Sequence, residues 1–392
     1  MARLIETRDL VTNFYTYEGI VQALDRVNLS VEHGATFGLV GESGCGKSVA
    51  VRSVMRIIQE PGRVESGSIL FYPDSAPDGR SKAVDLLQQS EAYMRGLRGD
   101  SISMIFQEPN AALNPIMSIG DQVAESFVFH RKQEMCRKIN TDLSSSQCRT
   151  VYPLKKFLQV MYRIAEKNPE SLLLKISSRI PILKLWDRPL RREALARSIE
   201  IIAKLGIPNA EEIVKRYPHN LSGGMKQRIV IAIALACNPI LLIADEATSN
   251  LDVTIQAQIL ELLRELKQKE ISSVLLITHD LGIVAETCDR VGVMYAGELC
   301  EVADVKDIFG SPRHPYTKAL LNSVPRLSQE GELQSIEGSV PNLVTPPTGC
   351  RFHPRCPHAM DSCRKKFPKT VTVGENHHVA CYLYTDEARK DG

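Results

Sequence analysis

Long apolar runs are missing from this chain. The longest uninterrupted one, residues 229–237, has nine residues, whereas a membrane-spanning helix needs about 20. We therefore expect no segment that crosses a bilayer. The first eight residues, Met-Ala-Arg-Leu-Ile-Glu-Thr-Arg, lack the apolar core of a secretory signal. The sequence thus predicts a cytoplasmic protein, either free or held at a membrane by a partner.

A strong charge of one sign is also missing. The formal net charge is only +2, which gives no support for a nucleic-acid-binding protein, whose domain charge is usually strongly basic. Hydrophobic residues make up 43% and charged residues 24% of the 392 residues. These values are near the globular average and exclude a disordered or fibrous chain. The length allows a full core with one or two appended modules.

Apolar runs and longer amphipathic stretches alternate along the chain. The expected strands are residues 37–40, 103–106, 240–244, 274–277 and 291–295. Between two of them, Ile255, Ile259, Leu262, Leu263 and Leu266 recur at helical spacing. This alternation predicts an α/β fold whose sheet is largely parallel at its centre.

Two segments interrupt the alternation. Residues 131–193 hold fifteen Lys or Arg and only six Asp or Glu, a local net charge of +9. Their pattern is helical around residues 154–165 and is then broken by Pro169, Pro181 and Pro189, which predicts an inserted helical subdomain. From Ser311 the proline density rises and strand-like runs end, so residues 311–392 are expected to form a smaller, loop-rich module.

A glycine-rich segment follows the first expected strand. Gly41-Glu42-Ser43-Gly44-Cys45-Gly46-Lys47-Ser48 fits the P-loop pattern, and a helix is expected behind it over residues 48–58. The glycines let backbone N–H groups point at a polyphosphate, and the helix N-terminus adds its dipole. Lys47 would reach the β- and γ-phosphates and the Ser48 hydroxyl would ligate Mg²⁺. The alternative interpretation is a glycine-rich turn with a solvated lysine.

Two other apolar runs end in polar residues. Asp245 and Glu246 follow one, and Thr278, His279 and Asp280 follow another. In a P-loop enzyme the first acid holds the magnesium shell and an adjacent Glu polarises the attacking water, whereas without a P-loop the pair would be an ordinary acidic helix cap. Because parallel strands end at one edge of the sheet, His279 is expected near Asp245, although a lone histidine is as often structural.

Residues 221–228, Leu-Ser-Gly-Gly-Met-Lys-Gln-Arg, match the signature motif of ABC transporter ATPases, which this chain resembles. Gln107 resembles the Q-loop of that family and residues 249–252 its D-loop. The resemblance implies a RecA-like P-loop ATPase core with a mostly parallel sheet, an antiparallel β subdomain and a helical subdomain that carries the signature. It also implies a head-to-tail pair of such domains, in which Ser222, Gly223 and Gly224 of one cover the ATP of the other.

The resemblance also implies roles for single residues. Catalysis is assigned to Glu246, His279, Gln107 and Lys47, and Mg²⁺ ligation to Ser48, Gln107 and Asp245. ATP contacts extend from the P-loop to Val49 and Asp252, and adenine is expected to stack on Tyr17, with Phe14 and Tyr15 as alternatives. Ala247 and Asn250 stand where the family commonly has Pro and Ala, and neither change removes a catalytic group.

Further motifs resemble the ATPase subunits of oligopeptide and dipeptide importers. They are Tyr-Pro-His at 217–219, Val-Thr-Ile-Gln-Ala-Gln at 253–258, Val-Met-Tyr-Ala-Gly at 293–297 and His-Pro-Tyr-Thr at 314–317. This resemblance implies an ATPase domain over residues 1–310, a C-terminal extension over 311–392, and ATP-driven peptide import at the cytoplasmic face of the cell membrane. The implied partners are a paralogous ATPase subunit, two permeases and an extracytoplasmic solute-binding protein, with no nucleic acid.

Several alternatives stay open. The same ATPase could serve sugar or nickel import, or be a soluble ABC protein acting on DNA or ribosomes, which would predict tandem ATPase or coiled-coil segments that this sequence lacks. A module that only binds a metal is disfavoured by Glu246 and His279. The basic residues of 131–193 are either a solvated surface or a contact for anionic lipid headgroups.

Four of the ten cysteines gather near the C-terminus. Cys350, Cys356, Cys363 and Cys381 are separated by five, six and seventeen residues. Four thiolates can hold Zn²⁺ or an iron–sulfur cluster, although zinc sites usually have pairs two to four residues apart. Some importer ATPases carry a [4Fe–4S] cluster on this extension, so the resemblance favours a structural [4Fe–4S] cluster, with Zn²⁺ and free thiols as alternatives.

Overall fold

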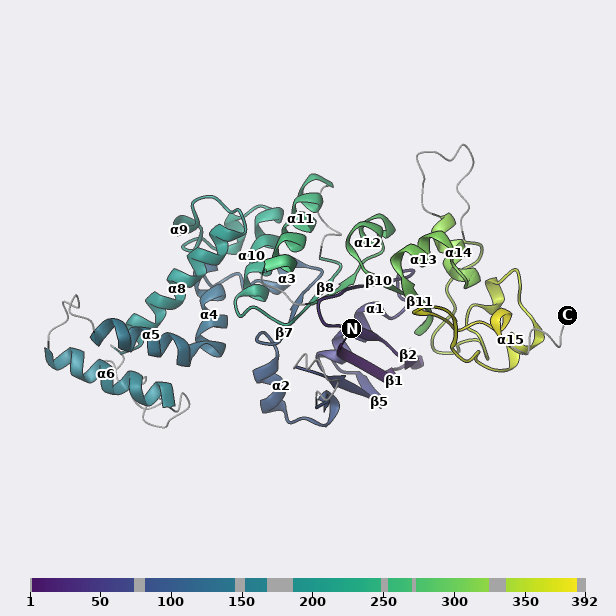
Figure 1. Cartoon of the computed structure of the whole chain (residues 1–392), viewed down its shortest axis with the longest axis horizontal. Coiled ribbons are helices and arrows are strands. Elements are labelled where there is room, and N and C mark those ends of the chain that lie inside the picture. Colours follow the sequence, from purple (N-terminus) through teal and green to yellow (C-terminus); the bar gives the residue numbers. More distant parts are fainter. Residues whose placement is uncertain are drawn as a thin grey trace. The chain divides into compact units, whose positions relative to one another are not determined.

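The computed structural model describes residues 2–73, 82–144, 152–167, 186–247, 253–269, 273–323 and 336–385. The chain divides into two compact units, and many of their elements are labelled in Figure 1. Unit 1 combines Met1–Arg98, Ile240–Ser249 and Leu263–Gly392, and unit 2 combines Gly99–Pro239 and Asn250–Leu262. The basic segment 131–193 therefore lies within unit 2, and its residues 145–151 and 168–185 are outside the described residues.

The centre of unit 1 is a sheet with the strand order β12-β13-β11-β10-β4-β9-β8. Its central strands are β4 (Thr36–Val40), β8 (Leu241–Asp245), β9 (Ser273–Ile277) and β10 (Arg290–Tyr295). These four pair in parallel, and every residue of β4, β8 and β9 is buried. Strands covered on both faces are apolar throughout, which is why the sequence predicted them correctly.

Helices connect and cover these strands. Those of unit 1 are α1 (Lys47–Val54), α2 (Glu91–Leu97), α12 (Leu281–Thr287), α13 (Val305–Gly310) and α14 (Pro315–Asn322), and α11 (Val253–Lys269) leads from β8 to β9. The strand–helix–strand unit expected from the helical spacing is thus confirmed. Helix α1 is shorter than the expected 48–58, because Arg56 takes a left-handed conformation with φ of 51° that ends the helix.

A second sheet in unit 1 is antiparallel. It contains β1 (Arg3–Thr16), β2 (Gly19–Val27), β3 (Ser30–Glu32), β5 (Gly62–Phe71) and β6 (Val84–Asp85), followed by a 3₁₀ helix, Leu86–Gln88. Strand β1 pairs with β2, β3 and β5. The β1–β2 turn, residues 17 and 18, therefore projects from the end of a hairpin, and this turn contains Tyr17.

The C-terminal residues extend the central sheet, so the expectation that strands end near Ser311 is wrong. Strand β11 (Glu298–Asp304) pairs antiparallel with β10 on one side and with β13 (His377–Val379) on the other, and β12 (Val371–Gly374) follows at the edge. The remaining short helices here are His353–Arg355, α15 (Asp361–Lys365) and Tyr382–Tyr384. An unpaired edge of β11 would expose backbone hydrogen-bonding groups, and β13 satisfies them.

Unit 2 is mainly helical and contains one described strand, β7 (Ile102–Ile105), which confirms the run expected at 103–106. Its helices are α3 (Pro109–Ala112), α4 (Ile119–His130), α5 (Lys132–Ser144), α6 (Tyr152–Lys167), α8 (Asp187–Lys204), α9 (Ala210–Ile213), Pro218–Asn220 and α10 (Gly223–Leu235). The expected break at Pro189 is wrong, because Pro189 lies in the first turn of α8, where proline costs no hydrogen bond. Pro169 and Pro181 lie outside the described residues.

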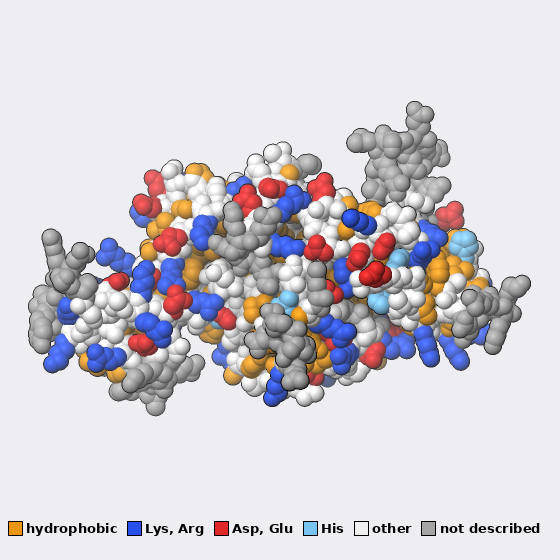
Figure 2. Space-filling model, in the orientation of Figure 1, with side chains coloured by type: hydrophobic (Ala, Val, Ile, Leu, Met, Phe, Trp, Pro, Cys, Tyr) orange, Lys and Arg blue, Asp and Glu red, His pale blue; other side chains and the backbone are white. Residues whose placement is uncertain are grey.

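Several basic residues of the segment 131–193 are paired with carboxylates. Arg137 contacts Glu166 at 3.0 Å and Lys138 contacts Glu193 at 2.7 Å. On the face shown in Figure 2, basic and acidic side chains are interspersed, as the net charge of +2 suggests. Among the described helices, none combines the length and the apolar character needed to cross a membrane.

Candidate functional site

The P-loop connects β4 to α1 in unit 1, and glycine is required at two of its positions. Gly41 has a φ of 152°, and a Cβ there would collide with the carbonyl oxygen of Met294. Gly46 has a φ of 102°, and its Cβ would lie 2.7 Å from the carbonyl oxygen of Ala23. Both the left-handed backbone and the close neighbours exclude larger residues. The remaining loop residues, Ser43, Gly44 and Cys45, and Val49 on α1, lie in this same segment.

Lys47 rests on the loop that precedes it. Its Nζ donates hydrogen bonds to the carbonyl oxygens of Gly41 over 2.8 Å and Glu42 over 3.0 Å, and lies 3.6 Å from the sulfur of Cys45. The side chain is buried, with 4% exposure. A buried ammonium whose described partners are neutral carbonyl oxygens and a thiol gains strongly from an anion, so this lysine is well placed to transfer to a phosphate oxygen.

Ser48 and Asp245 meet although they are far apart in sequence. The Ser48 hydroxyl donates a 2.8 Å hydrogen bond to Oδ1 of Asp245. Oδ2 of this fully buried carboxylate has no hydrogen-bond partner among the described residues, and the Arg52 guanidinium lies 4.0 Å away. Burial raises the pKa of Asp245, against the lowering effects of the Ser48 hydrogen bond and Arg52. A hydroxyl beside a spare carboxylate oxygen fits the hard oxygen ligands that Mg²⁺ prefers.

Glu246 and His279 lie side by side at the same edge of the sheet. The parallel register places Asp245 opposite Ile277, so the residues after β8 and β9 are neighbours. Nδ1 of His279 is 3.7 Å from Oε1 of Glu246. Glu246 has a left-handed φ of 48°, held by the hydrogen bond from its N–H to the carbonyl of Ile277 over 3.0 Å. Backbone strain of this kind gathers at functional sites.

The three aromatic residues that are candidates for stacking on adenine differ in the solvent exposure and the contacts of their rings. Tyr17 is 97% exposed at the tip of the β1–β2 hairpin. The hydroxyl of Tyr15 donates to Glu65 over 2.7 Å, and the ring of Phe14 packs against Gly62. A ring must present an open face to stack on a base, and Tyr17 has the most open one.

The signature residues begin a helix in unit 2. Ser222 is the N-cap of α10 and its hydroxyl accepts a hydrogen bond from the N–H of Met225 over 3.3 Å. A Cβ added at Gly223 would have no described atom within 4 Å, whereas one at Gly224 would lie 3.0 Å from Ile255. The helix therefore begins with an accessible backbone, which suits an anion. Gln107 is exposed after β7 in the same unit. The predicted Asp252 lies outside the described residues.

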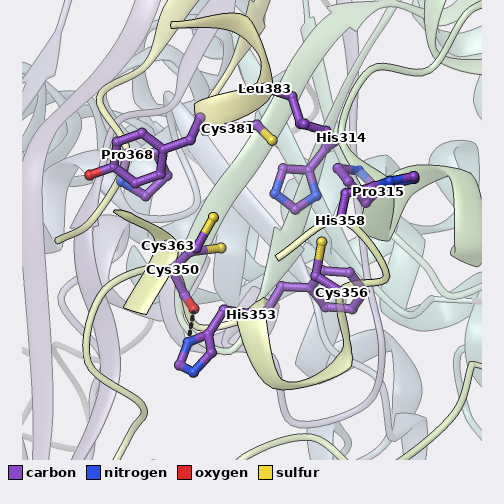
Figure 3. A pocket seen from close by; sticks show the side chains of 12 residues that line it. His314, Pro315, Cys350, His353, Cys356, His358, Cys363, Pro368, Cys381 and Leu383 are labelled. Atoms are coloured by element: carbon purple, nitrogen blue, oxygen red, sulfur yellow. Dashed lines mark hydrogen bonds between the residues drawn. The ribbon is translucent and has the colours of Figure 1, made fainter. Parts of the chain in front are cut away.

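The four C-terminal cysteines line one small pocket in unit 1. Figure 3 shows the side chains of Cys350, Cys356, Cys363 and Cys381 around this space, with His314, His353 and His358 nearby. None of these cysteines forms a disulfide. The free volume of about 10 Å³ is that of roughly one water molecule.

We call this space, lined by Cys350, Cys356, Cys363 and Cys381, the thiol pocket. Its side chains are not arranged as metal ligands in this structure. In the described part of the chain, no group of three or more His, Cys, Asp or Glu side chains is arranged to hold a metal ion. Burial raises the pKa of Cys350 to about 12 and that of Cys381 to about 11, because a thiolate is unfavourable in an apolar pocket. The cysteines predicted to act together do lie together, and their soft sulfur ligands suit zinc or an iron–sulfur cluster.

Two residues that contact the P-loop are not predicted by the sequence reasoning. Arg355 pairs with the carboxylate of Glu42, and the hydroxyl of Tyr316 accepts a hydrogen bond from the backbone N–H of Glu42. The sequence marked both residues only indirectly: Tyr316 belongs to the His-Pro-Tyr-Thr motif, and Arg355 directly precedes Cys356. Neither signal points to the P-loop.

Two family models match the chain. Residues 24–249 match the model described as ABC transporter, and residues 300–363 match the model described as oligopeptide/dipeptide transporter, C-terminal region. The first of these covers more than half of the chain and includes both the P-loop and the signature motif.

Curated relatives match over nearly the full length. The dipeptide transport ATP-binding protein DppD of Bacillus subtilis (strain 168) is 41% identical over 390 residues, covering 99% of this chain and 97% of that protein. The oligopeptide transport ATP-binding protein AppD of the same strain is 40% identical, covering 99% and 98%. A probable peptide ABC transporter ATP-binding protein of Sinorhizobium fredii is 40% identical, covering 97% and 94%.

Solved structures agree on the fold. A dimeric ATP-binding cassette in a post-hydrolysis state, bound to ADP and Pi, aligns with a TM-score of 0.53 at 20% identity. The alignment covers 77% of this chain and 99% of that chain. At this identity the likeness concerns the fold alone, and it confirms the α/β fold of an ABC cassette that the sequence predicted.

Proposed function

Since this chain belongs to the ABC transporter family and carries the oligopeptide/dipeptide transporter C-terminal region, we propose that it hydrolyses ATP to drive the import of peptides. The chain is an ATPase subunit of that family. The observation that carries the proposal is the meeting of Lys47, Ser48, Asp245 and Glu246 at one edge of a parallel sheet, in a chain whose full-length relatives are named as peptide transport proteins.

In the proposed mechanism each residue has a separate task. Lys47 exchanges its carbonyl partners for phosphate oxygens, while the P-loop amides and the α1 N-terminus surround the phosphates. Ser48 and Asp245 would hold Mg²⁺, which would neutralise negative charge on the phosphates. Glu246 orients and deprotonates the attacking water. His279, 3.7 Å from Glu246, contacts the γ-phosphate, and Tyr17 stacks on adenine.

Gln107, Ser222, Gly223, Gly224 and Asp252 complete the proposed site. We propose that the accessible start of α10 covers the ATP bound by a second ATPase subunit, a paralogue of this chain, and that Gln107 joins the Mg²⁺ shell. The exposed Ser222 and the open space that the described residues leave at Gly223 support this assignment, because an open helix start can accept a phosphate from another molecule. We propose residues 1–310 as the ATPase domain and residues 311–392 as an extension. In this arrangement, a complete ATP site combines the P-loop of one subunit with the signature residues of the other.

A membrane partner is part of the proposed function, because peptide import needs a passage through the bilayer and none of the described helices can cross it. We propose that two permeases hold the chain at the cytoplasmic face of the cell membrane and receive peptides from an extracytoplasmic solute-binding protein. Unit 2 contains a groove of about 390 Å³, lined by Met117, Phe129, His130 and Ile233 among others. Phe129 is 57% exposed there, and an exposed aromatic side chain in a groove is typical of a protein interface.

We therefore expect Phe129→Asp to weaken association with the permeases by about tenfold or more, because it puts a charge into the apolar part of the groove. Association is measured by co-purification of tagged permeases and titration in detergent. ATP binding by the isolated chain should not change. Tyr93→Asp, at a 40% exposed residue on α2, is the matched control. Unchanged association of the Phe129 variant would contradict this docking proposal.

The function itself is tested in liposomes that contain the purified permeases, both ATPase subunits and the solute-binding protein. The expected result is ATP-dependent accumulation of a labelled dipeptide, with ATP turnover stimulated by the loaded binding protein. Uptake of nickel or a sugar instead of peptides would keep the ATPase and reject the peptide cargo. Turnover without any uptake would favour a protein that does not transport solutes.

We also propose that the thiol pocket holds a structural [4Fe–4S] cluster. The support is the convergence of Cys350, Cys356, Cys363 and Cys381 on one pocket without disulfides. The pocket must widen from its present size to accept a cluster, since its free volume is about 10 Å³. The cluster would link the loops that carry the four cysteines.

Anaerobic purification should then yield a brown protein with about four iron and four sulfide per chain. Cys363→Ser is expected to lose most of this iron and to lower the melting temperature. Cys288→Ala, a buried cysteine outside the pocket, should keep it. Stoichiometric zinc would support the alternative Zn²⁺ site, and a colourless protein with neither metal would reject both.

A further inference from the structure

The P-loop residue Glu42 is held by side chains from the other end of the sequence. Its carboxylate accepts two hydrogen bonds from Arg355, Nη1 to Oε2 over 2.9 Å and Nη2 to Oε1 over 3.2 Å. Its backbone N–H donates to the hydroxyl of Tyr316 over 2.9 Å. Parallel hydrogen bonds between guanidinium and carboxylate fix direction as well as distance. The orientation of Glu42 is therefore set from outside the P-loop.

Arg355 is itself firmly placed. Its side chain is 5% exposed. Nε donates to the carbonyl of Glu337 over 2.8 Å, Nη1 donates to the hydroxyl of Tyr295 over 3.2 Å, and the guanidinium lies 5.7 Å from the centre of the Tyr295 ring. A side chain fixed in this way loses little freedom when it binds a carboxylate. It acts as a rigid support for Glu42.

Aromatic packing fixes the second contact. Tyr316 is fully buried, and its ring centre lies 4.6 Å from that of Tyr295 and 5.3 Å from that of Phe352. Phe352 directly precedes the 3₁₀ helix His353–Arg355. Because interiors are close-packed, a displacement of one ring requires movement of the others. The aromatic cluster therefore positions Tyr316 and Arg355 together.

These contacts bear on nucleotide binding through Lys47. The backbone of Glu42 donates its N–H to Tyr316 and offers its carbonyl to Nζ of Lys47 over 3.0 Å. When Lys47 turns to a phosphate, the loop loses that hydrogen bond, while the contacts from Tyr316 and Arg355 stay. We propose, building on the nucleotide-binding function above, that Arg355 is a positioning residue of the phosphate site, which holds Glu42 so that the P-loop keeps its shape when Lys47 leaves it.

The same arrangement connects the P-loop to the thiol pocket. Arg355 lies on the short segment between Cys350 and Cys356. The N–H of Cys356 donates to the carbonyl of His353 over 3.3 Å, and Nδ1 of His353 lies 2.9 Å from the carbonyl of Cys350. A change in the conformation of this segment moves Arg355. A change in the pocket is thus expected to reach Glu42 through Arg355, the residue of this segment that contacts it directly.

The test measures the dissociation constant of a fluorescent ATP analogue with Mg²⁺ for the full-length chain. Arg355→Ala is expected to weaken binding about tenfold, since a charge-assisted hydrogen-bonded pair is of that order. Arg355→Lys should recover only part of the affinity, because Lys cannot form two parallel hydrogen bonds. Glu42→Ala should have a similar effect, and the double variant should be no weaker than the single ones, because both act as one unit.

A second readout separates positioning from general damage. In the assembled transporter, Arg355→Ala should raise the KM for ATP while kcat stays close to wild type. Arg364→Ala, an exposed arginine in the same region, is the matched control and should bind like wild type. If folded Arg355→Ala binds like wild type, or if the Glu42 and Arg355 effects add, the proposal is wrong. Failure of the wild type to bind the analogue would instead reject the proposed function.

The link to the thiol pocket is tested with Cys356→Ser, using circular dichroism to select folded protein. This variant should weaken analogue binding when Arg355 is present and have little further effect in the Arg355→Ala background. Additive effects of the two changes would show that the pocket does not act through Arg355.

Discussion

Replacing Glu246 by Gln is expected to lower ATP turnover by about 10²–10⁴-fold, the usual contribution of a positioned general base. The amide keeps the shape of the side chain but cannot take a proton from the attacking water. ATP affinity should change by less than about threefold, because this residue acts on the water and not on the bound ground state. His279, 3.7 Å away, should still contact the γ-phosphate.

Turnover is measured on the assembled transporter, and affinity with the fluorescent analogue on the same variant. Glu286→Gln, an exposed residue on α12, makes the same chemical change away from the site and should leave both quantities intact. Equal losses of turnover and affinity would contradict the role of Glu246 as base. The left-handed backbone at this residue makes a melting curve a necessary companion measurement, because a variant that relaxes the turn would also lower turnover.

The second large effect is expected for Lys47→Ala, which should weaken ATP binding by about 100-fold. Truncating one partner of a buried, hydrogen-bonded charge pair costs about 2–5 kcal/mol, and about 1.4 kcal/mol corresponds to a factor of ten. Turnover at moderate ATP concentrations should fall in proportion. The loss differs from that of the Glu246 variant because here binding fails before the chemical step.

This variant also removes two hydrogen bonds to the carbonyls of Gly41 and Glu42 in the nucleotide-free protein. Its melting temperature must therefore be compared with wild type before affinity is interpreted. Lys306→Ala, an exposed lysine on α13, provides the matched control. A folded Lys47→Ala protein that binds ATP as tightly as wild type would refute the assignment of the phosphate site.

The local parts of the site could be predicted because they depend on few neighbouring residues. The P-loop requires glycines, a lysine and a hydroxyl at set spacing between a strand and a helix. The carboxyl edge of parallel strands explains why Asp245 and His279 were expected close together, because Asp245 ends one buried strand and His279 lies two residues after another. In each case, a short segment specifies both the conformation and the position of the side chain.

The sequence favoured Tyr17 over Phe14 and Tyr15 for adenine, but the exposure of these three rings could not be predicted in this way. All three lie within four residues, and their spacing does not say which ring faces solvent. The pairing of β1 with β5 brings Glu65 to the hydroxyl of Tyr15 and places Phe14 over Gly62, which leaves Tyr17 at the free tip of the hairpin. The strand register therefore decides which of the three rings faces solvent.

By itself, the sequence determined the α/β ATPase core, the family and the residues proposed to bind the phosphates, because each depends on short motifs in a fixed local backbone. Only the tertiary structure decided that β13 extends the central sheet and that Arg355 and Tyr316 hold Glu42, across separations of 313 and 274 residues. Such contacts follow from strand pairing and aromatic packing distributed over the whole unit. No short segment of the sequence is sufficient to predict these contacts.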